Sequence, residues 1–315
     1  MKTAKNVFWN AREKRVRAGW RLLIQLILFL LIVVGMAILA NTFGSGPVMA
    51  TTGSLIYLVG GLGLAWLMAR FIDHRPFADF GFHWNRTWWL DLGFGSALGA
   101  FLMTAVFLSM KAAGWVSVTR TATTNSGLPF GWAFLLKVVV YVAIGVNEEL
   151  TFRGYQLKNL SEGLTGKRIG PRVAIVLAFL ISSAAFSLGH ITNAGATVLS
   201  TLNLLVAGLS LGLPYMLTGE LAISVGLHIT WNLFEATVYG FPVSGSPPTT
   251  HLFSSQQTGP VVWTGGAFGP EAGLLSMCWT LVGVGLTVLW IRCRRERLGL
   301  HTPLVTYMSR SRSDL

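Results

Sequence analysis

Three short groups of polar residues lie within apolar segments of the chain and could together activate a water molecule. They are Asn147-Glu148-Glu149-Leu150-Thr151-Phe152-Arg153, Phe186-Ser187-Leu188-Gly189-His190 and His228-Ile229-Thr230-Trp231-Asn232. An ionisable side chain at membrane depth costs about 2.5 to 3.5 kcal/mol even on a lenient insertion scale, so such residues are candidates for function. One carboxylate and two imidazoles are enough to activate water, with a zinc ion or without one. The three groups therefore predict a hydrolytic site where their helices meet.

The two adjacent acids of the first group are expected to face different ways. On a continuous helix Glu149 and Arg153 share a face, whereas Glu148 is turned by about 100°. The guanidinium can then hold one carboxylate while the other points into a cavity. An alternative interpretation is a helix end at the membrane surface, with Glu149 and Arg153 as a plain ion pair and Glu148 in water. The spacing of these three residues does not decide between the two.

The histidines have simpler explanations when each is taken alone. His228 and Asn232 share one helix face, so the imidazole can act as a base or metal ligand and the amide can donate to an oxyanion. Such a pair can also serve as a hydrogen bond between membrane helices. His190 shares a face with Phe186 and can be a histidine at a helix end beside Gly189. Their joint occurrence with the acid pair on three helices favours one common site.

The composition indicates a membrane protein with many spans. Of the 315 residues, 52% are hydrophobic and 11% are charged, against about 25% charged residues in soluble proteins, and the mean hydropathy is +0.59. Because so few polar residues cannot cover a globular surface, we expect an all-α, polytopic membrane helical bundle with about eight transmembrane helices. The apolar runs cover residues 22–40, 55–71, 90–110, 132–148, 173–188, 198–217, 221–239 and 274–291.

The net charge of +12 predicts orientation in the membrane and does not indicate a nucleic-acid partner. All but three of the 24 Lys and Arg residues lie on the side of the two termini, the exceptions being Lys111, Arg120 and Lys137. Under the positive-inside rule, both termini should be cytoplasmic, in an integral, multi-pass protein of the plasma (inner) membrane. The loop 240–273 would then lie outside. It is rich in Gly, Ser, Pro and Thr, and we expect a mobile connection without chemistry.

At the three polar groups the sequence resembles the CPBP family of intramembrane proteases. This family contains the type II CAAX prenyl endopeptidases and the bacteriocin-processing or bacteriocin-immunity proteins, and its marks are E-E-x-x-x-R, F-x-x-x-H and H-x-x-x-N on successive helices. Here they stand in order as Glu148, Glu149 and Arg153, then Phe186 and His190, then His228 and Asn232. The stretches 75–81 and 218–221 also look like the family. The resemblance extends over about residues 75–232.

The resemblance implies an intramembrane endopeptidase that hydrolyses a peptide bond of a membrane-associated or lipidated protein or peptide. By similarity, Glu148 would be the general base and Asn232 would stabilise the oxyanion, while Glu149 and Arg153 would orient the set. The implied partners are the lipid bilayer and the peptide substrate.

The histidines would complete the same site. By similarity, His190 and His228 would bind the water, or would bind Zn²⁺ together with Glu148 if a metal is used, as in a metalloprotease. The domain organisation that follows is a basic cytoplasmic tail over 1–21, a transmembrane protease domain over 22–293 with a family-like core at about 75–239, and a basic cytoplasmic tail over 294–315.

Two other functions fit the same residues. In a proton- or ion-coupled transporter, Glu148, His190 and His228 would form an ion path, activity would depend on a gradient, and no cleaved product would appear. A catalytically silent immunity or scaffold protein would keep the fold and act by binding, but it would not need all three groups.

One geometric problem accompanies the expected spans. If the fifth helix starts near Arg172, His190 lies about 27 Å along it, near the far membrane surface. His228 is only seven residues beyond the expected start of its helix at Leu221. Straight, upright helices would keep the two imidazoles apart, so a tilt, a submerged start of the fifth helix or a break at Gly189 is required.

Overall fold

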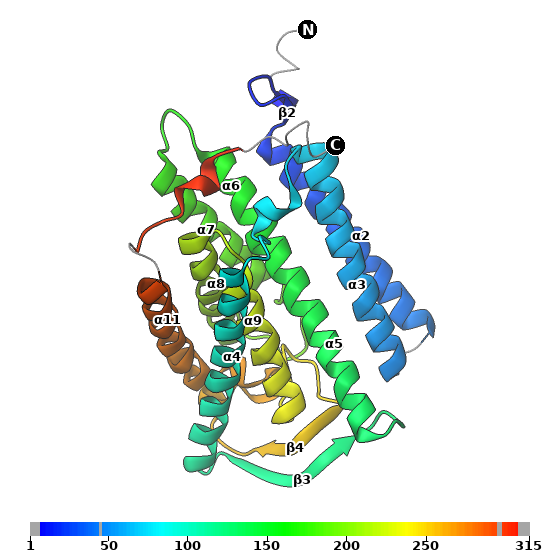
Figure 1. The fold of residues 1–315 in the computed structure, drawn as a ribbon. Coiled ribbons are helices and arrows are strands. Elements are labelled where there is room, and N and C mark those ends of the chain that lie inside the picture. Colours follow the sequence, from blue (N-terminus) through cyan, green and yellow to red (C-terminus); the bar gives the residue numbers. More distant parts are fainter. Residues whose placement is uncertain (1–6, 44–45, 295–297, 308–315) are drawn as a thin grey trace.

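The protein folds as a bundle of long helices, seen along its side in Figure 1. The computed structural model describes residues 7–43, 46–294 and 298–307. The α-helices, in chain order, are α2 Ala18–Phe43, α3 Pro47–Leu67, α4 Arg86–Ala112, α5 Phe130–Glu149, α6 Lys158–Leu164, α7 Pro171–Leu188, α8 Val198–Thr218, α9 Ala222–Asn232, α10 Val261–Thr264 and α11 Leu274–Arg294.

Several long helices continue into wider π-helical segments, and short 3-10 turns occupy the loops. The π-helical segments are η1 Met68–Asp73 after α3, η3 Leu150–Leu157 between α5 and α6, and η4 Leu233–Val238 after α9. The 3-10 turns are η2 Phe77–Phe80, η5 Gly266–Phe268, η6 Pro270–Ala272 and η7 Thr302–Val305. Because π-helical segments often accompany functional sites, it is notable that η3 contains Arg153 and that η4 follows Asn232 directly.

The expectation of a polytopic helical bundle is confirmed, with one difference in the number of full spans. Seven helices of the described residues are long and apolar enough to cross a membrane. They are Ala18–Leu39, Met49–Asp73, Arg86–Ala112, Phe130–Leu164, Pro171–Leu188, Val198–Thr218 and Leu274–Arg294. The remaining expected span, 221–239, forms α9 with 11 residues and η4 with 6 residues. It lies between α4 and α5 in Figure 1 and is mostly buried, so it is an internal helix rather than a full-length span.

Glycines bring α9 against α4. A Cβ atom at Gly99 of α4 would lie 2.4 Å from the carbonyl oxygen of Leu227, and one at Gly226 of α9 would lie 2.4 Å from that of Leu92. Only glycine allows so close an approach of two helix backbones, as is common between membrane helices. The pattern fixes α9, and with it His228, in the centre of the bundle.

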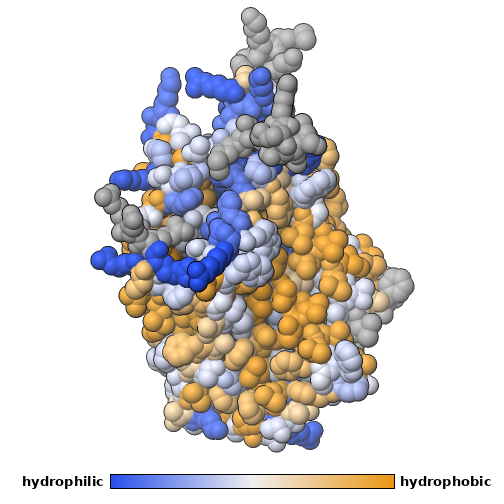
Figure 2. Space-filling model, in the orientation of Figure 1, coloured by the Kyte–Doolittle hydropathy of each residue, from blue (hydrophilic) through white to orange (hydrophobic). Residues whose placement is uncertain are grey.

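The outer surface of the bundle suits a lipid environment. Figure 2 shows apolar residues over the middle of the molecule and hydrophilic residues gathered at the end where the chain begins. On α2 and α3, large apolar side chains such as Leu31 and Val59 are 62% and 68% exposed. Exposure of this extent on helices of membrane length is expected only where lipid covers them. The chain is therefore an integral, multi-pass membrane protein.

Two small antiparallel sheets mark opposite ends of the bundle. Strands β1 Trp9–Asn10 and β2 Arg15–Val16 pair near the start of α2, whereas β3 Val116–Thr124 and β4 Thr250–Gln257 pair at the other end. The turn η7, close to the end of the described chain, lies at the β1–β2 end beside α6 and α7 (Figure 1). The described ends of the chain therefore share one side, as the sequence predicts. Which side faces the cytoplasm stays a prediction.

The structure describes only part of the two predicted basic tails. Residues 1–6, 295–297 and 308–315 of these tails lie outside the described residues. Within the described part, Arg15 and Arg21 are 0% and 2% exposed and donate hydrogen bonds to Glu162 of α6. The segment 1–21 is therefore not wholly a solvent-exposed tail, because Arg15 and Arg21 are packed inside the protein.

Candidate active site

The acid pair lies inside a continuous helical segment and not at its end. The chain stays helical from Phe130 through η3 to Leu164. Glu149 and Arg153 are both fully buried, and Arg153 Nη1 donates to Glu149 Oε1 at 3.0 Å while Nη2 donates to the Gly208 carbonyl of α8 at 3.0 Å. The alternative interpretation, a solvated helix end at the membrane surface, is therefore wrong.

Glu149 connects the first motif to the third. Its Oε1 lies 2.8 Å from Nδ1 of His228 and also accepts the hydrogen bond from Arg153. Because an ionised carboxylate only accepts hydrogen bonds, Nδ1 of His228 carries a proton and Nε2 is left to face the cavity. The charge-assisted hydrogen bonds hold the imidazole in one orientation and one tautomer.

Glu148 faces the other way, as the helical spacing predicts. Its side chain is 18% exposed and lines the cavity, and its Oε2 lies 3.7 Å from Nε2 of His228. That separation exceeds a direct hydrogen bond and is suited to a bridging water. The two adjacent acids therefore occupy different environments, with Glu149 enclosed and Glu148 open.

His190 reaches the same cavity from the turn after α7. The helix ends at Leu188, and Nδ1 of His190 lies 2.9 Å from the carbonyl oxygen of Phe186. Since a carbonyl oxygen only accepts, Nδ1 is the donor and Nε2 is the free ring nitrogen. The ring of Phe186 neighbours both imidazoles, with its centroid 5.0 Å from that of His190 and 6.1 Å from that of His228.

The depth of α9 removes the geometric problem found in the sequence. The hydroxyl of Ser224, near the start of α9, donates to the carbonyl of Leu211 in the middle of α8 at 2.7 Å. The helix that carries His228 therefore begins well inside the bundle. Its seventh residue comes level with Phe186, near the far end of α7. The submerged start therefore belongs to the seventh predicted helix, not to the fifth as expected.

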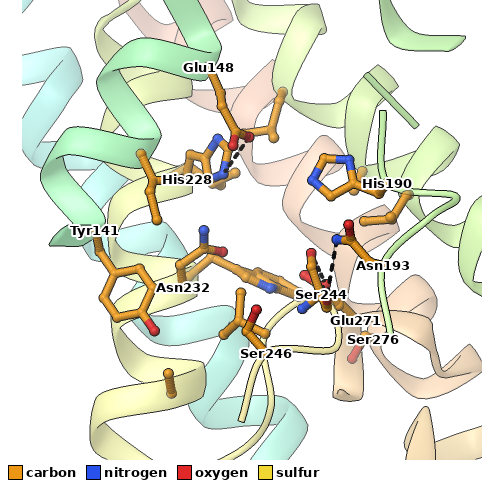
Figure 3. Close-up of a pocket in the computed structure, with 18 of the residues that line it drawn as sticks. Tyr141, Glu148, His190, Asn193, His228, Asn232, Ser244, Ser246, Glu271 and Ser276 are labelled. Carbon is orange, nitrogen blue, oxygen red and sulfur yellow. Dashed lines mark hydrogen bonds and ion pairs between the residues drawn. The ribbon is translucent and has the colours of Figure 1, made fainter. Parts of the chain in front are cut away.

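Six α-helices (α4, α5, α7, α8, α9 and α11), the segments η4 and η6, and the loops after α7 and before β4 enclose a cavity of about 360 Å³. Four of the predicted site residues line it, namely Glu148, His190, His228 and Asn232, and Figure 3 shows them around a common space. Glu149 and Arg153 lie behind the wall and contact it through His228 and Phe186. The cavity is also lined by Tyr141, Asn193, Ser244, Ser246, Glu271 and Ser276, none of which was a candidate from sequence.

The loop 240–273 lines part of this cavity and contains β4, α10, η5 and η6, so it is more than a connection between two helices. Glu271 Oε1 accepts hydrogen bonds from the backbone N–H of Ser244 at 2.7 Å and from its hydroxyl at 2.5 Å. Asn193 donates to the Ser244 carbonyl at 3.0 Å. Burial raises the pKa of Glu271. These contacts fix the loop as one wall of the cavity, visible at the lower right of Figure 3.

The candidate zinc ligands do not form a metal site in this conformation. Within the described residues, no group of three or more His, Cys, Asp or Glu side chains is placed to hold a metal ion. His228 uses Nδ1 for Glu149, and His190 uses Nδ1 for the carbonyl oxygen of Phe186. Zinc in catalytic sites takes three protein ligands at about 2.0 to 2.3 Å, and Glu148, His190 and His228 do not converge in that way.

Residues 129–234 match the family model described as type II CAAX prenyl endopeptidase, Rce1-like. This segment is similar to the Rce1-like family. It runs from the start of α5 into η4 and so contains all three motifs, whereas the expected resemblance began earlier, at residue 75. The Rce1-like domain supports an intramembrane endopeptidase of CAAX type in general. Comparison with curated proteins and with solved structures gives no match.

Proposed function

We propose that the chain is an intramembrane endopeptidase in which Glu148 activates water to hydrolyse a peptide bond of a membrane-associated or lipidated substrate. The observation that supports this proposal is that two adjacent acids have different surroundings. Glu148 is open to the cavity, while Glu149 is enclosed and holds His228 and Arg153. A general base must reach the water, and of these two acids Glu148 is the one that lines the cavity.

The reaction begins at Glu148. Its carboxylate takes a proton from a water molecule, and the resulting hydroxide attacks the carbonyl carbon of the scissile peptide bond. The tetrahedral intermediate then collapses as the C–N bond breaks, and the proton held by Glu148 passes to the leaving nitrogen. Atoms and charge balance, since one water is consumed and one carboxyl and one amino terminus are formed.

Asn232 and His228 are suited to the oxyanion of that intermediate. They project from one face of α9 into the cavity on the same side as Glu148. The Asn232 amide offers N–H donors, and removing one such donor in other hydrolases costs about 10²- to 10³-fold in kcat. Nε2 of His228 would bind the attacking water or, once protonated, would donate to the oxyanion.

Glu149 and Arg153 are positioning residues in this mechanism. Glu149 keeps the proton of His228 on Nδ1, and Arg153 holds the Glu149 carboxylate in place through its hydrogen bond. Arg153 also lies 4.5 Å from the ring centroid of Phe186, the residue that supports His190. His190, with Nε2 free, is placed to bind the substrate or a second water.

No step of this mechanism passes through a metal. The donor geometry of Glu148, His190 and His228 favours water activation by the carboxylate itself. Dependence on Zn²⁺ is a separate prediction, which chelation tests directly.

The cavity wall supports a substrate with apolar segments. Beside its polar groups, it is lined by aliphatic side chains from four helices, namely Leu102, Val140, Ile144, Leu204, Leu211 and Leu227. A lipidated or apolar peptide would gain burial from such a surface. Because the matching family is named for CAAX prenyl endopeptidases, a farnesylated peptide with a CAAX end is the first substrate to test.

The experiment compares wild-type protein and two variants, each reconstituted in liposomes, for cleavage of a quenched fluorescent farnesylated CAAX peptide. Glu148→Gln should lose cleavage by about 10²-fold or more, because the amide cannot accept the proton. The control is Glu220→Gln, which changes an acid outside the cavity lining and should keep full activity. Cleavage by Glu148→Gln at the wild-type rate would overturn the assignment.

The same assay distinguishes a protease from the alternative function, a transporter. A protease cleaves the peptide in detergent micelles, where no gradient exists. A transporter would give no cleaved product there or in liposomes. If the farnesylated peptide is not a substrate, comparison of membrane proteomes from cells with wild type and with Glu148→Gln identifies proteins processed by the wild type alone.

A further inference from the structure

Lys137 is the single Lys or Arg side chain among the described residues that line the active-site cavity. It lies on α5, within the membrane-spanning segment Phe130–Leu164. Within the described residues it has no hydrogen-bond or ion-pair partner. An ammonium group at membrane depth is costly unless it is paired or reaches water. Because Lys137 lines the cavity, its ammonium group can reach water there. Its charge is then available to a ligand.

The position of Lys137 on α5 points it into the cavity together with Glu148. Residues 137, 141, 144 and 148 recur at helical spacing and all four line the cavity, so they share one face of the helix. The 11 residues between Lys137 and Glu148 correspond to about 16 Å along the axis. Lys137 therefore lies about three turns from the proposed catalytic base, on the same wall.

The acid on the facing wall does not neutralise this lysine. Glu271 holds the loop: its Oε1 accepts hydrogen bonds from the backbone N–H and the hydroxyl of Ser244, and its own backbone N–H donates to Oε1 of Glu235. Glu148 is the other acid that lines the cavity, and it lies beside His228. Lys137 is thus a free cation at one end of a cavity whose other end holds the proposed hydrolytic groups.

An extended peptide would connect these two ends. A chain in extended conformation advances about 3.3 to 3.6 Å per residue, so 16 Å corresponds to about five residues. The length of the lysine side chain and the water between Glu148 and the scissile bond both reduce the length of peptide needed to connect the two ends. A group bound by Lys137 would therefore lie about three to five residues from the bond that is cut.

We propose that Lys137 binds a carboxylate of the substrate peptide, three to five residues from the scissile bond, and so selects the substrates that the cavity accepts. This inference rests on the proposed function, because it takes Glu148 as the place of cleavage. The carboxylate can be the α-carboxylate of the peptide's own C-terminus or the side chain of an acidic residue. Both sources supply the same chemistry, a planar anion that accepts hydrogen bonds from an ammonium group.

The test measures binding without turnover. Glu148→Gln protein in lipid nanodiscs is titrated with fluorescent farnesylated peptides that have three residues after the modified cysteine. One peptide ends in a free carboxylate, one in a carboxamide, and one in a carboxamide with Asp as its last residue. In the presence of Lys137 the free acid should bind about tenfold more tightly than the amide, the usual scale of a charge-assisted hydrogen bond.

Substitutions at Lys137 assign that preference to the lysine. In the same Glu148→Gln protein, Lys137→Met should reduce the ratio of the two dissociation constants to about one without weakening the amide, and Lys137→Arg should keep most of the ratio. Lys111→Met is the matched control. Lys111 lies in the last turn of α4, is exposed and does not line the cavity, so its loss should leave the ratio unchanged. Tight binding of the amide with Asp would assign the carboxylate to a side chain, and weak binding would assign it to the C-terminus.

The outcomes separate this inference from the proposed function. A tenfold ratio of the two dissociation constants that persists in Lys137→Met overturns the inference. Equal binding of the acid and the amide to the protein that retains Lys137, or binding of neither, also overturns it. If the ratio depends on Lys137 but wild-type protein cleaves none of the peptides, the proposed function fails and the binding site stands. If wild type cleaves acid and amide equally well, the endopeptidase stands and the role of Lys137 is wrong.

Discussion

Replacing Glu149 by glutamine should destabilise the protein much more than the same change at Glu148. Glu149 is fully buried and accepts hydrogen bonds from Arg153 at 3.0 Å and from His228 at 2.8 Å. The substitution leaves the Arg153 guanidinium buried without its counter-charge, which typically costs about 3 to 5 kcal/mol of unfolding free energy. Glu148→Gln should cost less than about 1 kcal/mol, because Glu148 is partly exposed and its contact with His228 is 3.7 Å long.

A double variant tests whether the buried charge is the cause. Glu149→Gln with Arg153→Met removes both charges and should recover about 2 kcal/mol or more relative to Glu149→Gln alone. It should stay inactive, because His228 has lost the group that sets its tautomer. The assay is unfolding in mixed micelles by sodium dodecyl sulfate, followed by tryptophan fluorescence. Equal stability of Glu149→Gln and Glu148→Gln, or no recovery in the double variant, would refute the positioning role of Glu149.

Three further outcomes are expected. Asn232→Ala should lower kcat by about 10²- to 10³-fold with little change in KM, measured with the cleaved peptide, because an oxyanion donor acts in the transition state; a change in KM alone would contradict this. Exhaustive chelation with 1,10-phenanthroline should leave cleavage unchanged, whereas loss of activity that zinc restores would show that the histidines and Glu148 rearrange around a metal. Because burial raises the pKa of Glu271, its neutral form stabilises the fold, and this contribution is lost as the pH rises from the unfolded value of about 4.3 through the raised folded pKa. Thermal unfolding should therefore become easier across that range in wild type and less so in Glu271→Gln; identical pH profiles would contradict the buried, neutral state of Glu271.

Much of the site could be predicted from the sequence because local spacing determines which side chains share a helix face. The i,i+4 relation placed Glu149 with Arg153 and turned Glu148 away, and both features are present. The same rule placed His228 and Asn232 together in the cavity. The family resemblance added the order of the three motifs, which the match over residues 129–234 contains in full.

The remaining features depend on contacts between distant parts of the chain. The bond from Glu149 to His228 joins residues 79 positions apart, and no local pattern specifies it. The submerged start of α9 follows from its packing on glycines of α4, so hydropathy alone counted it as a full span. Glu271 and Ser244 lie in a polar loop whose composition resembles that of a mobile connection, and only the folded chain brings them to His190.

The role proposed for Lys137 could be predicted only in part from the sequence. Its position inside an apolar span was visible in the sequence and is a signal of function by itself. Its relation to Glu148 could also be read from the helical spacing of residues 137, 141, 144 and 148. The cavity that these residues share could not be predicted from the sequence, because other walls of the cavity come from α8, α9 and the loop before β4.

The central claim is that water activated by Glu148 cleaves a peptide bond in this cavity. The most direct test is cleavage of the farnesylated CAAX peptide, or of a substrate found by membrane proteomics, in water enriched in ¹⁸O, with mass spectrometry of both products. With wild-type protein, the new C-terminal carboxyl group should carry ¹⁸O, and with Glu148→Gln no product should form above background. A product without ¹⁸O in its new carboxyl group, or labelled product at an equal rate with Glu148→Gln, would contradict the claim.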